Sequence, residues 1–259
     1  NTFNIDDVGY DTASAAGLSG GDLTITGASV GTKQGFSIIE YVGNNSTGQT
    51  VKHGLTQEPD FIIVKNKLQS YEWMIYHRSM GANYYGLFAT SAFLNDANIW
   101  ADTEPTNEHF YVSVHNSPAG YSNGPNGTFI SYVWHDVPGF SKFGSYAGNN
   151  SSDGPVIITG FRPRLILIKC SSSNQSGNAH WLLFDGERNK FNVSSNIILG
   201  NVSDREYTAA DGVVGIDILS NGFKIRDTNT SRNASATYIY AAFAESPTFN
   251  LYGAQSNAR

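Results

Sequence analysis

The chain has 259 residues and a formal net charge of −6, from 16 Lys and Arg against 22 Asp and Glu. Nucleic acid is not an expected partner, because phosphate binding needs clustered Lys and Arg, and without a run of 18 apolar residues no membrane insertion is expected. The single cysteine, Cys170, excludes an internal disulfide and a cysteine metal cluster. Asn1 to Asn4 have neither a charged nor an apolar run, so we expect no signal peptide, and without an initiator Met we expect a processed chain, a fragment or a partial sequence.

Residues 1–34 are predicted to form an N-terminal arm without a core of its own. Residues 4–10 read as a strand. Residues 11–18 are the best helix candidate, with Asp11 or Thr12 as N-cap and Gly17 as the stop. Residues 23–26 read as an extended edge segment. Such an arm normally docks on a larger body, which is either its own sandwich or a neighbouring subunit.

The rest of the chain predicts an all-β protein. Short runs rich in Val, Ile, Phe, Tyr and Thr are separated by Gly, Asn and Ser clusters, which is the pattern of many hairpins. No long segment has the 3, 4, 7 apolar spacing of an amphipathic helix. The predicted strands are 36–41, 61–65, 73–77, 110–114, 129–134, 156–159, 165–169, 181–184, 223–226 and 238–243.

An internal duplication is the most informative pattern. Gly35-Phe36-Ser37 recurs 104 residues later as Gly139-Phe140-Ser141, and Tyr41 to Ser46 recurs 105 residues later as Tyr146 to Ser151. Later matches keep the same order with loop-sized drift. We therefore predict two tandem duplicated β-sandwich units, jelly-roll-like in size, at 35–138 and 139–259, the second ending in a short tail.

The repeated positions are expected to serve the fold. The Gly-Asn-Asn triplets 43–45 and 148–150 read as tight turns in which Gly and Asn adopt positive φ. Trp73 and Trp181 match at 108 residues and read as core residues. Sequons such as those at Asn126 and Asn233 are attributed to composition, because Asn, Ser and Thr are abundant.

No catalytic or metal-binding pattern rises above background. The six histidines form no HxH or HExxH pair, and no EF-hand loop is present. No Gly-x-Ser-x-Gly signature occurs, and the scattered carboxylates cannot be paired from sequence. We therefore expect no enzyme, no metal and no cofactor.

Aromatic residues that lack a match in the other repeat are candidates for binding. Exposed Tyr and Trp near Asn and Asp are typical of sugar-binding or protein-binding surfaces, although packing at a rim explains any one of them as well. The candidate residues for a glycan or receptor are Tyr84, Tyr85, Trp100 and Tyr121.

Several phrases, in this order, resemble a known family. They include Gly35 to Ile39, His53 to Asn66, Gly139 to Tyr146, Ser220 to Lys224 and Thr237 to Glu245. Together they resemble a domain of uncharacterised function near the C-termini of tailed-bacteriophage virion proteins, especially of marine and cyanobacterial phages. The resemblance implies a structural or adhesive role on a virus particle and defines no site residues. The stretch Trp134 to Pro138 departs from the family, which more usually has a phenylalanine and acidic residues before the Gly-Phe pair found here at 139–140.

Three functions are compatible with these patterns. The first is a non-enzymatic virion surface protein, such as a tail fibre, spike tip or capsid-attached fibre or decoration domain. It would contact other virion proteins and form a homo-oligomer, for example a trimer. The second is a carbohydrate-binding module at a fibre tip that contacts a host surface glycan. The third is a polysaccharide-degrading spike, which requires a carboxylate pair across a cleft. The first is preferred, with the virion surface as its location.

Overall fold

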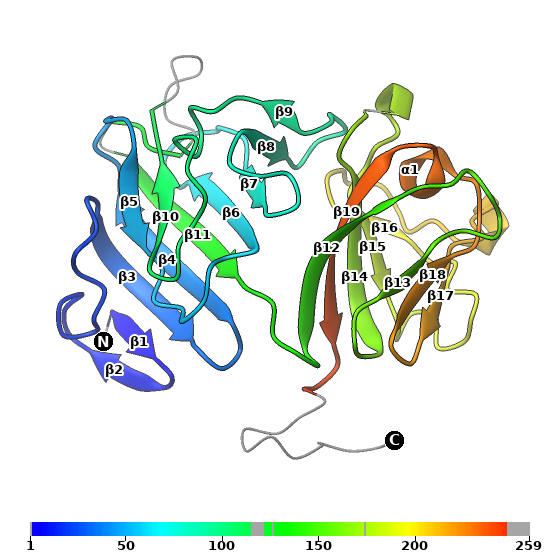
Figure 1. Ribbon diagram of the computed structural model, residues 1–259, viewed down its shortest axis with the longest axis horizontal. Helices are drawn as coiled ribbons and strands as arrows, with labels where there is room; N and C mark the ends of the chain where they lie inside the picture. Colours follow the sequence, from blue (N-terminus) through cyan, green and yellow to red (C-terminus); the bar gives the residue numbers. More distant parts are fainter. Residues whose placement is uncertain (1, 115–121, 126, 174, 248–259) are drawn as a thin grey trace. The chain divides into compact units, whose positions relative to one another are not determined.

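The computed structural model describes residues 2–114, 122–125, 127–173 and 175–247, and the chain divides into two compact units (Figure 1). Unit 1 comprises Asn1–Leu87 and Phe93–Asp136, and unit 2 comprises Phe88–Ala92 and Val137–Arg259. Regular structure in the described part of the chain is almost entirely strand, so the all-β class and the sandwich character are confirmed. The tandem duplication and the jelly-roll assignment stay predictions.

Unit 1 packs a large sheet over a small one. In the described residues the large sheet has the order β2-β1-β3-β4-β11-β6-β7-β8-β9, and the small sheet pairs β10 with β5. The bounds are β1 Phe3–Ile5, β2 Val8–Tyr10, β3 Thr24–Gly31, β4 Phe36–Val42, β5 Gln49–Lys52, β6 Phe61–Asn66, β7 Met74–His77, β8 Tyr84–Leu87, β9 Leu94–Asn95, β10 His109–Val112 and β11 Thr128–Trp134.

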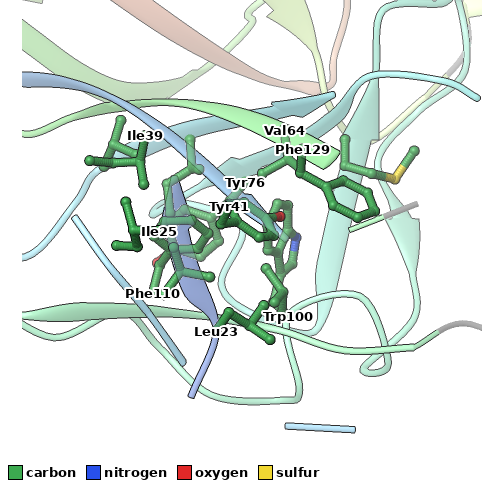
Figure 2. Packing of buried hydrophobic residues seen from close by; sticks show 14 of the residues in the cluster. Leu23, Ile25, Ile39, Tyr41, Val64, Tyr76, Trp100, Phe110 and Phe129 are labelled. Carbon is green, nitrogen blue, oxygen red and sulfur yellow. The ribbon is translucent and has the colours of Figure 1, made fainter. Parts of the chain in front are cut away.

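The core of unit 1 lies between these two sheets. Alternate residues of β4 and β11, among them Ile39, Tyr41 and Phe129, are fully buried. Figure 2 shows Phe110 of the small sheet in the same cluster. Period-two alternation places these apolar side chains on one face of the large sheet, and their burial supplies the main stabilisation of the unit.

Unit 2 has a five-stranded and a three-stranded sheet within the described residues, in the orders β12-β19-β14-β15-β16 and β13-β18-β17. A second apolar cluster fills the space between them. The bounds are β12 Ser141–Ala147, β13 Val156–Ile158, β14 Pro163–Cys170, β15 Leu182–Asp185, β16 Ile198–Leu199, β17 Ile216–Leu219, β18 Gly222–Ile225 and β19 Thr237–Ala244, with 3-10 turns at Gln175–Gly177 and Ala209–Asp211 and a helix α1 at Thr230–Asn233.

A buried tyrosine closes one end of each sandwich. In unit 1 the Tyr41 hydroxyl donates to the Ser122 carbonyl at 2.6 Å, and the Tyr41 ring stacks on Phe129 at 5.2 Å. In unit 2 the Tyr146 hydroxyl donates to the Arg232 carbonyl at 2.8 Å, and the Tyr146 ring stacks on Tyr238 at 5.1 Å. Burial raises the pKa of both hydroxyls that donate to carbonyls.

A buried asparagine holds the neighbouring turn in each unit. The Asn123 side chain accepts from the Asn44 amide at 2.9 Å and donates to the Ser46 carbonyl at 2.7 Å. The Asn233 side chain accepts from the Asn149 amide at 2.9 Å and donates to the Ser151 carbonyl at 2.7 Å. Because the Asn233 side chain is fully buried and hydrogen-bonded, it fits a structural role and is not accessible as a glycosylation acceptor.

The glycines of the two Gly-Asn-Asn turns are required by close approach and not by positive φ. Asn45 and Asn150 have positive φ of 59° and 51°, as expected, whereas neither Gly43 nor Gly148 has. A Cβ on Gly43 would lie 2.5 Å from the Gly124 carbonyl oxygen, and one on Gly148 would lie 2.0 Å from the Ala234 oxygen. Any larger residue would therefore force the turn apart.

The predicted arm is an integral part of unit 1. Strand β3 pairs antiparallel with β4, and Leu18 and Leu23 lie in the core, so these residues pack on their own sandwich. The expected single strand over 4–10 is instead a hairpin, because Asp6 and Asp7 adopt positive φ and reverse the chain.

The prediction of a helix over residues 11–18 is wrong. Its caps form as expected, since Thr12 Oγ1 accepts from the Ala15 amide at 3.1 Å and Gly17 has a φ of 70°. Only turns lie between them, because the two caps leave no room for more than a single turn.

The two matched tryptophans differ in burial. Trp181 is a core residue at 2% exposure, as expected, and Phe88 packs on it at 5.2 Å within unit 2. Trp73 is 36% exposed, so its expected core position is wrong. Its ring instead stacks on Tyr132 and lies under the Lys65 ammonium.

We expect Gly43→Ala to lower the free energy of unfolding by about 3 kcal/mol, because the new methyl group overlaps the Gly124 carbonyl. The matched control is Gly27→Ala, whose Cβ meets only ordinary contacts, the nearest at 3.5 Å. Urea denaturation of both variants checks this. Equal stability of the two variants would contradict the steric argument.

A buried histidine makes unit 1 sensitive to acid. His53 is fully buried, its Nδ1 accepts from the Leu55 amide at 3.1 Å, and its Nε2 lies 3.1 Å from the Thr106 carbonyl. The neutral ring satisfies both contacts. Desolvation lowers the pKa of His53 from 6.5 to about 4, against the hydrogen bond to Thr106, which raises it.

Between pH 6.5 and 4 the unfolded chain therefore binds a proton at His53 that the folded chain does not bind, so stability falls as the pH falls through this window. We expect the free energy of unfolding of the wild type, relative to His53→Gln, to drop by about 3 kcal/mol from pH 7 to pH 4. Urea titrations of both proteins at each pH measure the difference. A difference that does not change with pH would refute the assignment.

Candidate functional site

An open groove of about 440 Å³ lies in unit 2 beside the short edge strand β16. We name its lining residues as follows: the apolar residues Leu182, Ile197 and Leu199 are the floor, the segment around Tyr207 and the helix α1 are the walls, and the polar residues Asn178, His180, Asn229 and Thr230 are the rim. Grooves of this size and mixed polarity are where small ligands bind. We therefore take it as the candidate functional site.

Strands β15 and β16 build the floor. Leu182 and Leu199 are direct partners in this antiparallel pair, and both line the groove. Ile197 extends the floor, and its backbone exchanges hydrogen bonds with Tyr207 at 2.8 and 2.9 Å. The floor therefore fixes the position of the Tyr207 wall through the main chain.

Charged side chains stabilise the Tyr207 wall. The Arg205 guanidinium lies 5.4 Å from the centre of the Tyr207 ring and binds both carboxylate oxygens of Asp211, at 3.0 and 2.6 Å. The Arg205 guanidinium holds the pKa of Asp211 well below its usual range. The Tyr207 hydroxyl donates to Asp204 at 2.9 Å, which raises the pKa of Tyr207.

The other wall, α1, is held by Tyr238. Its buried hydroxyl donates to the Thr230 carbonyl at 2.7 Å and accepts from the Ala234 amide at 2.8 Å. The guanidinium of Arg232, 2% exposed, is ion-paired with Asp227. The helix is one turn long, so these buried contacts and not helix propensity maintain it.

Polar groups at the rim have hydrogen-bonding capacity left over. Within the described residues no partner is found for His180 Nε2, Asn178 Oδ1, Asn229 Nδ2 or Thr230 Oγ1, all from residues that line the groove. His180 is oriented through its other nitrogen, which lies 3.2 Å from Asn201 Nδ2. The rim therefore presents both donors and acceptors to solvent.

The described residues contain no cluster of three or more His, Cys, Asp or Glu that could hold a metal ion. A separate observation concerns membranes: no helix in the part of the chain described here is long and apolar enough to cross one. The chemistry the groove offers is stacking on an apolar floor combined with hydrogen bonding at the rim.

The residues chosen from the sequence do not form this groove. Tyr84 and Tyr85 lie on β8 in unit 1, both partly exposed, and Tyr85 packs against the core. Trp100 is 2% exposed and packs edge-on against Tyr76, so its expected exposure is wrong. Tyr121 lies outside the described residues. A glycan role for Tyr84 and Tyr85 stays a prediction.

Sequence reasoning missed Tyr207 and His180. No motif distinguishes Tyr207 from the other tyrosines of the chain, and His180 is one of six scattered histidines. For Tyr207 the available signal is its place in the long segment between the strands predicted at 181–184 and 223–226, and His180 lies directly before the first of these strands.

We expect Tyr238→Phe to lower the free energy of unfolding by about 2 kcal/mol, because the partly buried Thr230 carbonyl and Ala234 amide lose the hydroxyl that both of them contact. Tyr207→Phe is the matched control, since it removes the same atom from a partly exposed ring and should change stability by less than about 0.5 kcal/mol. Urea denaturation measures both values. Equal losses would show that the α1 wall does not depend on Tyr238.

Comparison with known proteins identifies a family without a described activity. No curated protein and no solved structure matches the chain. A family described as a domain of unknown function (DUF7483) matches residues 11–247, which span both units. The chain therefore belongs to this DUF7483 family.

Proposed function

We propose that this protein is a non-enzymatic structural protein of a tailed-bacteriophage particle, where it lies on the particle surface and takes part in assembly and host-cell attachment. It belongs to a tail fibre or spike, or to a capsid-attached fibre or decoration. The observation that carries the proposal is the ordered series of phrases that resemble phage virion proteins over nearly the whole chain.

The segments that carry the resemblance form parts of the fold. Residues 61–66 form β6 and residues 237–244 form β19, which are interior strands of the two larger sheets. The sequence segments that resemble the phage family therefore lie on strands and turns, and none of them lines the groove of unit 2. This is what a family with a common scaffold and varied surfaces would have.

Contacts with other chains are part of the proposal. Strand β13 is an edge of its sheet in the described residues, and its Val156 and Ile158 are 50% and 57% exposed. Exposed apolar residues on an edge strand favour pairing with another copy or another virion protein. A homo-oligomer, for example a trimer, would cover this edge.

The proposal is tested on particles purified from a culture of the host. We expect mass spectrometry to detect the chain in the particles, and gold-labelled antibodies raised against the pure protein to decorate their surface. Antibodies first absorbed with the pure protein are the control. Absence of the chain from purified particles would overturn the proposal.

A further inference from the structure

We propose that the groove of unit 2 binds a neutral saccharide, one or two pyranose rings long. The inference rests on the proposed attachment function, in which a host surface glycan is the contact. Three features of the groove carry it: its charge, the combination of its polar and apolar groups, and its rigidity.

The groove has no uncompensated charge among its described residues. Two charged side chains line it, Asp211 and Arg232, and each is paired within the protein. Asp211 is bound by both guanidinium nitrogens of Arg205, at 3.0 and 2.6 Å, and Arg232 is paired with Asp227. A charged ligand would lose its hydration without gaining an opposite charge, so a neutral ligand is favoured.

The groove combines the polar and apolar groups that a pyranose can contact. The C–H face of a sugar ring is apolar and fits the floor of Leu182 and Leu199, with Tyr207 at one side. Sugar hydroxyls both donate and accept, and the rim offers His180 and Thr230 among its unpaired groups. A flat apolar ligand would leave this rim unused, and a fully polar one would gain nothing from the floor.

Both walls are formed before a ligand arrives. The Tyr207 wall is joined to the floor by two main-chain hydrogen bonds at 2.8 and 2.9 Å, and α1 is fixed by the buried Tyr238 hydroxyl. A preformed site has less conformational entropy to lose when a weakly interacting ligand binds. This matters for saccharides, whose hydroxyls exchange water for protein partners with little net gain.

Unit 1 differs at the residue that follows its edge strand. Trp100, which follows β9 as Tyr207 follows β16, is buried at 2% exposure against Tyr76 and offers no exposed ring to a ligand.

The test is nuclear magnetic resonance on the full chain, with methyl glycosides of glucose, galactose, mannose and N-acetylglucosamine as probes at millimolar concentrations. Glucuronate is the charged comparison. We expect at least one neutral glycoside to shift the amide signals of residues 178–182 and 229–232, and glucuronate to bind more weakly.

Two groove variants and one matched control sharpen the test. Thr230→Val and His180→Ala each remove one rim group, and each should weaken binding by about fivefold. Thr228→Val makes the same change on an exposed threonine two residues away that does not line the groove, and should leave the affinity unchanged. Thermal melts confirm that all three variants remain folded.

Three results would overturn the inference: no shift with any neutral glycoside, shifts confined to residues away from the groove, or tighter binding of glucuronate than of every neutral glycoside. Each of these can occur while the chain is still found on phage particles. Conversely, saccharide binding in the groove together with absence from particles would leave this inference standing and overturn the proposed function.

Discussion

The structure depends on a buried tyrosine hydroxyl that has only a main-chain carbonyl as its partner. Tyr41 of β4 donates to the Ser122 carbonyl at 2.6 Å, and Tyr146 of the edge strand β12 donates to the Arg232 carbonyl in α1 at 2.8 Å. A buried hydroxyl without a partner is costly, so the accepting segment can adopt few positions once the strand is packed. That segment also carries the buried asparagine that fixes the Gly-Asn-Asn turn. One contact thereby determines how the end of each sandwich closes.

This dependence also explains how much the sequence alone could predict. All ten strands that were predicted outside the N-terminal arm are present. Each of them is a dense run of β-branched and aromatic residues, and this pattern is local. Strands such as β5, Gln49–Lys52, and β17, Ile216–Leu219, were not predicted, since one is largely polar and the other follows a Gly-rich segment. Their strand geometry comes from pairing with distant residues, which a local pattern does not contain.

The site was harder to predict for a related reason. Trp100 and Tyr207 are both aromatic residues that follow a short edge strand, and composition does not distinguish them. Trp100 is buried because it finds the edge of Tyr76 in the core, whereas Arg205 and Asp204 hold Tyr207 at the surface. Exposure is therefore decided by neighbours in space, and the same holds for Trp73 and Trp181, which match in the sequence and differ in burial.

The two units differ by one oxygen atom in an otherwise matched stacked pair of rings. Phe129 and Tyr238 stack on Tyr41 and Tyr146 in nearly identical geometry, with both interplanar angles at 13°. The added hydroxyl of Tyr238 provides a donor for Thr230 and an acceptor for Ala234, so the chain there can form one helical turn that an isolated four-residue segment would not maintain. That turn is one wall of the groove. A scaffold with closely similar sheet cores can thus acquire a binding surface on one side without disturbing the packing on which both cores depend.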